Sequence, residues 1–209
     1  MLAEQLSAVR EAGWRFLDVS DALRGLRDPR GLPPASALVT FDDGYRSLIE
    51  RGLAVLRELR CPGVVFVPTA HVGGVNAFDE GIAEPLEPLC SWDELRELEA
   101  KGISVQSHGF RHLHLSSVSP DLLQAEMERS KREVEERLQK KVDVFAFPYG
   151  DGGRDPTAAT RVLRRCGYRA ACLYGGGPVA LPAVDPYRLS RLSLGFGSDL
   201  AIELGESVG

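Results

Sequence analysis

Two kinds of apolar pattern alternate along the chain. Short apolar runs predict β-strands, and they cover residues 15–20, 37–41, 63–68, 103–107, 142–148 and 168–174. Longer segments, with apolar residues three and four positions apart, predict amphipathic helices at residues 2–12, 20–26, 45–60, 91–102, 119–141 and 155–167. Residues 31–36 contain two adjacent prolines and predict a loop, and residues 186–195 are a candidate for one further strand.

Local signals mark the ends of some of these helices. Ser91 and Glu94, three positions apart at the start of the 91–102 helix, form a predicted capping box. Ser20 or Asp21 is expected to begin the 20–26 helix. The 119–141 helix is densely charged, and we expect its charges to lie on a solvated outer face.

The regular alternation of strand and helix predicts the fold class. It is typical of an α/β domain with a mainly parallel sheet, here a single domain over residues 1–209. The sheet can be an open doubly wound sheet or a barrel, and the apolar pattern does not separate the two. In both architectures ligands bind at the carboxyl ends of the strands, so the residues that follow each strand are the candidates for function.

Composition narrows the classes of partner. The 209 residues are 44% hydrophobic and 26% charged, as in a globular protein with a substantial core. The net charge of −5 argues against nucleic acid as the main partner, because phosphate binding needs a basic face. No apolar run approaches the ~18 to 20 residues of a membrane span. The four cysteines have no spacing typical of a zinc site.

The first residues, "MLAEQLSAVREAGW", show no basic segment followed by an apolar stretch. The sequence as written therefore predicts no signal peptide and a cytoplasmic protein. An extracytoplasmic location is expected instead if an upstream segment is missing. The oligomeric state has no signature in the sequence.

Polar residues gather after three of the predicted strands. Asp42 and Asp43 follow the 37–41 strand, His108 and His112 follow the 103–107 strand, and a Pro-Tyr-Gly turn follows Phe147. An isolated Asp-Asp-Gly is more often an ordinary turn. However, three of the four histidines of the chain lie within seven residues, and two of them are four positions apart. This clustering favours a metal site.

The residue types suit a division of labour. Two histidines and one carboxylate are an open ligand set for a divalent metal, with room for water and substrate. Such a metal polarises a carbonyl group and lowers the pKa of water, and a second carboxylate can then accept the proton. Tandem aspartates are explained if one of them binds the metal and the other acts as the base.

The motifs "TFDDGY" (40–45), "SHGFRHLHL" (107–115) and "FAFPYG" (145–150) resemble, in order and spacing, three signature motifs of the polysaccharide deacetylase family, carbohydrate esterase family 4. "DPYRLSRLSL" (185–194) is similar to the closing strand of its exopolysaccharide-linked branch, which includes poly-N-acetylglucosamine deacetylases. The resemblance implies a deformed (β/α) barrel with fewer than eight repeats. It also implies metal-dependent removal of N-acetyl groups from an amino-sugar polymer, so that the partner is an N-acetylated glycan.

The resemblance also implies roles for individual residues. Asp43, His108 and His112 would bind the metal, which is usually Zn²⁺ in the family, although some members use Co²⁺, Ni²⁺ or Mn²⁺. Asp42 would be the general base. The backbone N–H of Tyr149 would help to hold the tetrahedral oxyanion.

The sequence departs from the best-known branch of the family at two points. Phe147 stands where that branch has an arginine that orients the base, and we expect Arg191, on the last predicted strand, to pair with Asp42 instead. A histidine that donates the second proton has no counterpart after His114. His71 is the candidate donor of that proton, and His114 is expected to pack or cap locally.

Several residues are candidates for substrate contacts. Asn76 and Asp79 lie in the 73–81 loop, which resembles a substrate-side loop of the exopolysaccharide-linked branch. Tyr45, Phe110 and Pro148 stand beside the three motifs and are expected to line the cleft or to pack beneath it.

Two other functions fit the same residues. The site could hydrolyse a non-polymeric amide, such as a cyclic ureide or a formylated sugar. Alternatively the chain could be a weakly active or inactive glycan-binding module, which the missing proton donor favours.

Overall fold

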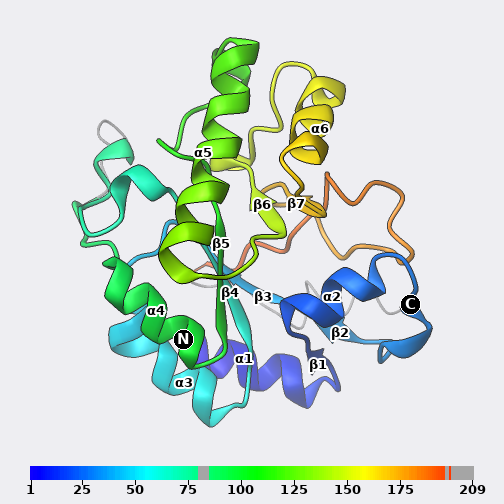
Figure 1. Cartoon of the computed structure of the whole chain (residues 1–209). Helices are drawn as coiled ribbons and strands as arrows, with labels where there is room; N and C mark the ends of the chain where they lie inside the picture. The colour runs from blue at the N-terminus through cyan, green and yellow to red at the C-terminus, as the bar shows by residue number, and fades with distance from the viewer. Residues whose placement is uncertain (80–84, 196–197, 199–209) are drawn as a thin grey trace.

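Five parallel strands form the main sheet, and they follow one another in chain order. The computed structural model describes residues 1–79, 85–195 and 198. The strands are β3 (Val39–Phe41), β4 (Gly63–Val67), β5 (Ile103–Ser107), β6 (Val144–Ala146) and β7 (Ala170–Cys172). The sheet curls into part of a barrel, and helices lie along its outside (Figure 1). The predicted α/β class and deformed barrel are therefore confirmed.

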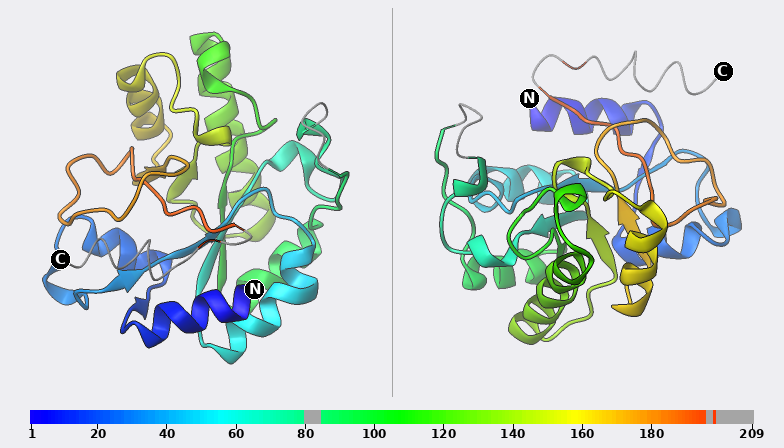
Figure 2. Two further views of the ribbon diagram at one scale, coloured as in Figure 1. Left: turned by 180° about the vertical axis from the view of Figure 1, so that it is seen from behind. Right: turned by 90° about the horizontal axis from the view of Figure 1, so that it is seen from above.

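Six α-helices connect or flank these strands in the described part of the chain. They are α1 (Leu2–Glu11), α2 (Val19–Gly25), α3 (Leu53–Glu58), α4 (Trp92–Ala100), α5 (Pro120–Leu138) and α6 (Pro156–Arg165). A wide helical turn at Leu48–Gly52 leads into α3. Helices α4 and α5 both pack against β5, and α6 packs against α5 (Figure 2). The central strand β5 is therefore held from outside by two helices.

The helix starts follow the predicted capping chemistry in one case and differ in another. The Ser91 side chain accepts a hydrogen bond from the Glu94 N–H, and the Glu94 carboxylate accepts one from the Ser91 N–H, which confirms the capping box. Helix α2 is capped by Asp18, whose carboxylate accepts from the Asp21 N–H at 2.8 Å. The prediction of Ser20 or Asp21 as the first residue was wrong, because Asp18 offers the same chemistry earlier in the chain.

Some strands are shorter than predicted or lie elsewhere. The predicted 15–20 strand is only β1 (Arg15–Phe16), which pairs in parallel with β2 (Ser36–Ala37), at the end of the predicted loop. The 186–195 strand is reduced to one bridge, in which Leu189 pairs with Cys172. The 45–60 helix begins late because Tyr45 instead pairs with Leu89.

The core lies on both faces of the sheet. Residues 64–67 of β4 are at most 1% exposed, as expected for a parallel strand covered on both sides. Val65 and Val67 belong to the cluster that contains the buried leucines of α4 and α6, whereas Phe66 packs in a second cluster with Leu23 of α2. This two-sided burial holds β4 between two packed clusters, and with it the residues that follow the strand.

Charges of α5 lie mostly on the outer face, as predicted, but Glu126 does not. Its side chain is 1% exposed, on the buried face that also carries Leu123, Met127 and Val134. In the described part of the chain, no helix is both long enough and apolar enough to cross a membrane.

Candidate metal centre and active site

The strand ends bring the predicted site residues together. Asp42 and Asp43 follow β3, His108 follows β5, and Tyr149 lies in a short helical turn (Pro148–Gly150) after β6. Parallel strands place these ends at one edge of the sheet. The residues come from three separate segments of the chain.

Backbone strain is concentrated at this edge. Asp43, His112 and Tyr149 all have positive φ angles, of 67°, 57° and 56°. A non-glycine residue in this left-handed region costs on the order of 1–3 kcal/mol and persists only where the surroundings enforce it. Gly150 follows with φ 69°, and a Cβ on it would lie 2.6 Å from the Tyr174 Cβ, so only glycine fits there. Such strain is typical of functional sites.

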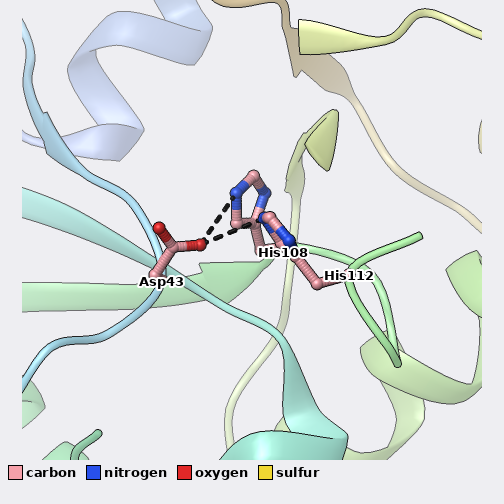
Figure 3. A group of neighbouring side chains, drawn as sticks. All are labelled: Asp43, His108 and His112. Atoms are coloured by element: carbon pink, nitrogen blue, oxygen red, sulfur yellow. Dashed lines mark ion pairs between the residues drawn. The ribbon is translucent and has the colours of Figure 1, made fainter. Parts of the chain in front are cut away.

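Asp43, His108 and His112 form a compact cluster (Figure 3). Asp43 Oδ1 lies 3.1 Å from His112 Nε2 and 3.5 Å from His108 Nε2. One ligand atom from each residue lies within 4.8 Å of the others. The three side chains thus converge on one point from the residues after β3 and from the loop after β5.

The donor atoms of this cluster fit a divalent cation. Asp43 Oδ1 is buried and has no hydrogen-bond partner among the described residues. His108 Nδ1 donates to the Ala146 carbonyl oxygen at 2.9 Å, which leaves Nε2 as the free acceptor. Burial lowers the pKa of His108, although Asp42 and Asp43 oppose this shift, so the imidazole is neutral near pH 7. Two imidazoles and one carboxylate are a suitable set for a metal such as zinc.

Asp42 points to a different partner. Arg191 Nη1 and Nη2 donate to its two carboxylate oxygens, each at 2.7 Å, as the sequence predicted. Arg191 Nε donates to the Leu173 carbonyl at 2.7 Å, which anchors the guanidinium after β7. Burial alone would raise the pKa of Asp42, but the charge of His108 in its protonated form and the Arg191 guanidinium outweigh this effect and hold the pKa below its usual value. Asp42 is therefore ionised and held in one orientation.

A mostly apolar hollow of about 570 Å³ lies beside the cluster. Its walls include His71, Phe78, His112, His114 and Tyr149. The Phe78 ring lies 4.2 Å from the His112 ring and 4.9 Å from the His71 ring, measured between centroids. The Tyr149 hydroxyl donates to the Phe78 carbonyl oxygen at 3.0 Å, and its ring stacks on His114 at 4.0 Å. The hollow is thus lined by aromatic rings next to the candidate metal ligands.

Phe78 is not predicted from the sequence, where only the polar residues of its loop stand out as candidates. His71 does line the hollow, so its predicted role as proton donor stays a prediction. His114 packs on Tyr149, and its Nδ1 lies 3.8 Å from Asp151 Oδ2, so it packs locally as predicted.

The 73–81 loop is held by its own polar residues, and its last two residues lie outside the described ranges. Asn76 is 1% exposed; its Oδ1 accepts from the Glu87 N–H at 2.7 Å, and its Nδ2 donates to the Tyr45 hydroxyl at 3.3 Å. Both ends of the Asn76 amide therefore have hydrogen-bond partners within the protein, and the sugar contact predicted for Asn76 stays a prediction. The Tyr45 hydroxyl donates to Asp79 Oδ2 at 3.2 Å, and contacts of these two residues with substrate stay predictions.

Phe110 and Pro148 both pack against other parts of the protein, and contacts of these two residues with substrate stay predictions. The Phe110 ring faces α5, where the Arg129 guanidinium covers it at 3.6 Å, and it does not line the hollow beside the metal ligands. Pro148 is buried, and its Cγ would lie 3.5 Å from a Cβ placed on Gly109. Phe110 therefore packs on α5, and Pro148 packs beside Gly109 of the loop that carries His108 and His112.

Comparison with known proteins is consistent with this geometry. A family model described as "Polysaccharide deacetylase" matches residues 30–171. YxkH of Bacillus subtilis (strain 168), named as a putative polysaccharide deacetylase, is 23% identical over 142 residues, which are 68% of this chain and 47% of that protein. The poly-beta-1,6-N-acetyl-D-glucosamine N-deacetylase of Escherichia coli (strain K12) is 26% identical over 200 residues, with 80% of this chain and 29% of that protein covered.

A solved structure shares the fold. IcaB from Ammonifex degensii superposes with a TM-score of 0.75 and 27% sequence identity, over 90% of this chain and 82% of that chain. The chain spans less than half the length of the two curated relatives described above. The family match over residues 30–171 covers the Asp43–His108–His112 cluster, Asp42 and the Pro-Tyr-Gly turn.

Proposed function

Because the chain belongs to the polysaccharide deacetylase family, we propose that it is a metal-dependent hydrolase that removes acetyl groups from the amino sugars of an N-acetylated glycan. The observation that carries this proposal is the pairing of a three-residue ligand cluster with a separate, arginine-bound carboxylate. Both parts accelerate the hydrolysis of an amide: an electrophile polarises the carbonyl group, and a base accepts the proton of water.

Asp43, His108 and His112 would hold the metal, for which zinc is the first candidate and cobalt, nickel or manganese are alternatives. When bound, the metal would supply Lewis-acid chemistry, polarising the amide carbonyl and lowering the pKa of water. The protein supplies the remaining parts of the reaction through Asp42, Tyr149 and the hollow.

Asp42 is suited to act as the general base. Its Oδ2 lies 3.9 Å from His108 Nε2, so the carboxylate borders the same space as the ligand atoms. Arg191 keeps it ionised, and an ionised carboxylate accepts the proton of the water that attacks the amide carbon. The new C–O bond forms as that proton moves to Asp42.

The Tyr149 turn and the hollow would hold the substrate. The strained Tyr149 backbone is positioned by the turn after β6, and its N–H is proposed to donate to the developing oxyanion. The aromatic walls of the hollow suit the apolar face of a sugar ring. When the C–N bond breaks, the amine leaves with a proton; His71 is the proposed donor because it lines this hollow.

The class of substrate is proposed from the relatives. The Escherichia coli relative is named for its action on poly-beta-1,6-N-acetyl-D-glucosamine, so an oligomer of β-1,6-linked N-acetylglucosamine is the first substrate to test. The zinc-loaded or cobalt-loaded protein is expected to release acetate and to create an equal amount of free amine. Binding of the oligosaccharide without acetate release would contradict hydrolysis and favour a glycan-binding module. A cyclic ureide and a formylated sugar are tested in parallel. Hydrolysis of one of these, without acetate release from the oligosaccharide, would favour an amidase that acts on a non-polymeric amide.

Replacing Arg191 with alanine tests how Asp42 is kept ionised. Without the guanidinium the pKa of Asp42 is expected to rise, because Arg191 lowers it in the native protein. Since the base works only when it is deprotonated, the acidic limb of the kcat/KM profile should move to higher pH, while bound metal is retained. An unchanged pH profile and unchanged kcat would contradict the proposed role of Arg191.

A further inference from the structure

The loop between the two histidine ligands has an unusual backbone. It runs from His108 to His112, with φ 80° at Gly109 and φ 57° at His112. This path turns the N–H groups of Phe110 and Arg111 toward helix α5. Backbone N–H groups that are turned away from water need acceptors, and here α5 supplies one.

Glu126 of α5 is that acceptor. Its Oε2 accepts from the Phe110 N–H at 3.1 Å and from the Arg111 N–H at 2.7 Å. Its Oε1 accepts from Arg111 Nε at 2.8 Å. The carboxylate is 1% exposed, and these three donors offset the free energy that a buried charge would otherwise cost.

The two histidine ligands differ in how their rings are held. His108 is fixed by the hydrogen bond from its Nδ1 to the Ala146 carbonyl. His112 Nδ1 is buried and has no hydrogen-bond partner within the described ranges. The direction of the His112 ring therefore depends on its backbone and on the rings of Phe78 and Tyr149 that pack against it.

We propose that Glu126 is a positioning residue of the metal centre, which sets the direction of His112 by clamping the loop backbone. Hydrogen-bonded partners of a ligand normally hold the imidazole itself. Here Glu126 does not bind the His112 ring. It holds the backbone N–H groups of the two residues that precede His112. This inference rests on the proposed function, since it requires that His112 binds a metal.

A carboxylate is the group that fits this place. It has two oxygens that only accept, and here both face donors. The amide of a glutamine would turn its NH₂ toward Arg111 or toward the loop amides, and one donor would lose its partner. An aspartate would keep the charge but is shorter by one methylene group. Both substitutions should therefore loosen the loop.

The test compares Glu126→Gln with Glu133→Gln in the full chain. Like Glu126, Glu133 lies on α5 and accepts a hydrogen bond from an arginine: its Oε1 accepts from Arg129 Nε at 2.9 Å. Unlike Glu126, its carboxylate forms no hydrogen bond with residues 108–112, all of which the structure describes. Zinc affinity is measured by competition with a chelating dye, and the visible spectrum of the Co²⁺-loaded protein reports ligand geometry. We expect Glu126→Gln to weaken zinc binding about tenfold to a hundredfold and to change the Co²⁺ spectrum. Glu133→Gln should leave both the zinc affinity and the spectrum of the native protein unchanged.

Thermal unfolding of the metal-free proteins shows whether each variant folds. If Glu126→Gln does not fold, Glu126→Asp replaces it, with the same expectation. Native zinc affinity and an unchanged Co²⁺ spectrum in the folded variant would overturn the role of Glu126 and leave the proposed function intact. Absence of zinc and cobalt binding in the native protein would instead contradict the proposed function itself.

Discussion

Replacing Asp43 with alanine is expected to remove the bound metal and to lower the rate of acetate release about a thousandfold or more. Asp43 is the only carboxylate of the three-residue cluster, and its Oδ1 lies within 3.5 Å of both histidine Nε2 atoms. Loss of this oxygen leaves only the two imidazoles of the cluster, and two ligands hold a divalent cation less well than three. A metal contributes several kcal/mol of charge stabilisation, and each ~1.36 kcal/mol corresponds to a factor of about ten in rate. Metal content and acetate release are measured on the same sample.

A second variant separates loss of the metal from loss of stability. Asp43 has φ 67°, where alanine is less favourable than aspartate, so Asp43→Ala can lower stability for a reason unrelated to metal. His108 is not among the residues with positive φ, and His108→Ala is expected to show the same double loss. Retention of one tightly bound metal in both variants would mean that the cluster is not the binding site.

Replacing Asp42 with asparagine is expected to keep the metal and to abolish most turnover. The substitution is nearly isosteric, and the Arg191 guanidinium can still donate to the remaining carbonyl oxygen. An amide cannot accept the proton of water, so the rate should fall by about a hundredfold to ten-thousandfold. The measurements are again metal content and acetate release, with native protein as the reference.

Substitutions of the two adjacent aspartates are thus expected to have opposite effects on metal content. If Asp42→Asn lost the metal while an Asp43 variant kept it, the assignment of ligand and base would be reversed. The geometry opposes that reversal, because both oxygens of Asp42 are held by Arg191 whereas Asp43 Oδ1 has no hydrogen-bond partner among the described residues.

Residues that follow strands could be predicted from the sequence. The apolar runs locate the strand ends, and parallel strands carry their ends to one edge, so the meeting of Asp43 with His108 and His112 follows from topology. Arg191 lies 149 positions from Asp42, and its pairing was predicted only from its place on the last apolar segment. That segment forms a single bridge, and the Leu173 carbonyl holds the guanidinium in place.

Other parts of the site could not be predicted, for physical reasons. A charge pattern along a helix does not indicate which backbone amides elsewhere in the chain need an acceptor. The sequence therefore predicts a solvated face for all the charges of the 119–141 helix, including Glu126. Its spacing from Leu123, Met127 and Val134 was the available signal. The place of Phe78 could not be predicted for a similar reason. Polarity directs attention to Asn76, whose amide hydrogen-bonds to the Glu87 N–H and the Tyr45 hydroxyl, whereas the apolar ring of Phe78 packs against His112.

Titration of the metal-free protein with Zn²⁺, with acetate release from an N-acetylglucosamine oligosaccharide as the readout, decides whether the chain is a metal-dependent deacetylase. Activity is expected to be absent without metal, to rise in proportion to added Zn²⁺, and to stop rising at about one equivalent per chain, because the described residues group one set of three ligands. Acetate release that is the same with and without metal would contradict metal-dependent hydrolysis, and so would a fully metal-loaded protein that releases none.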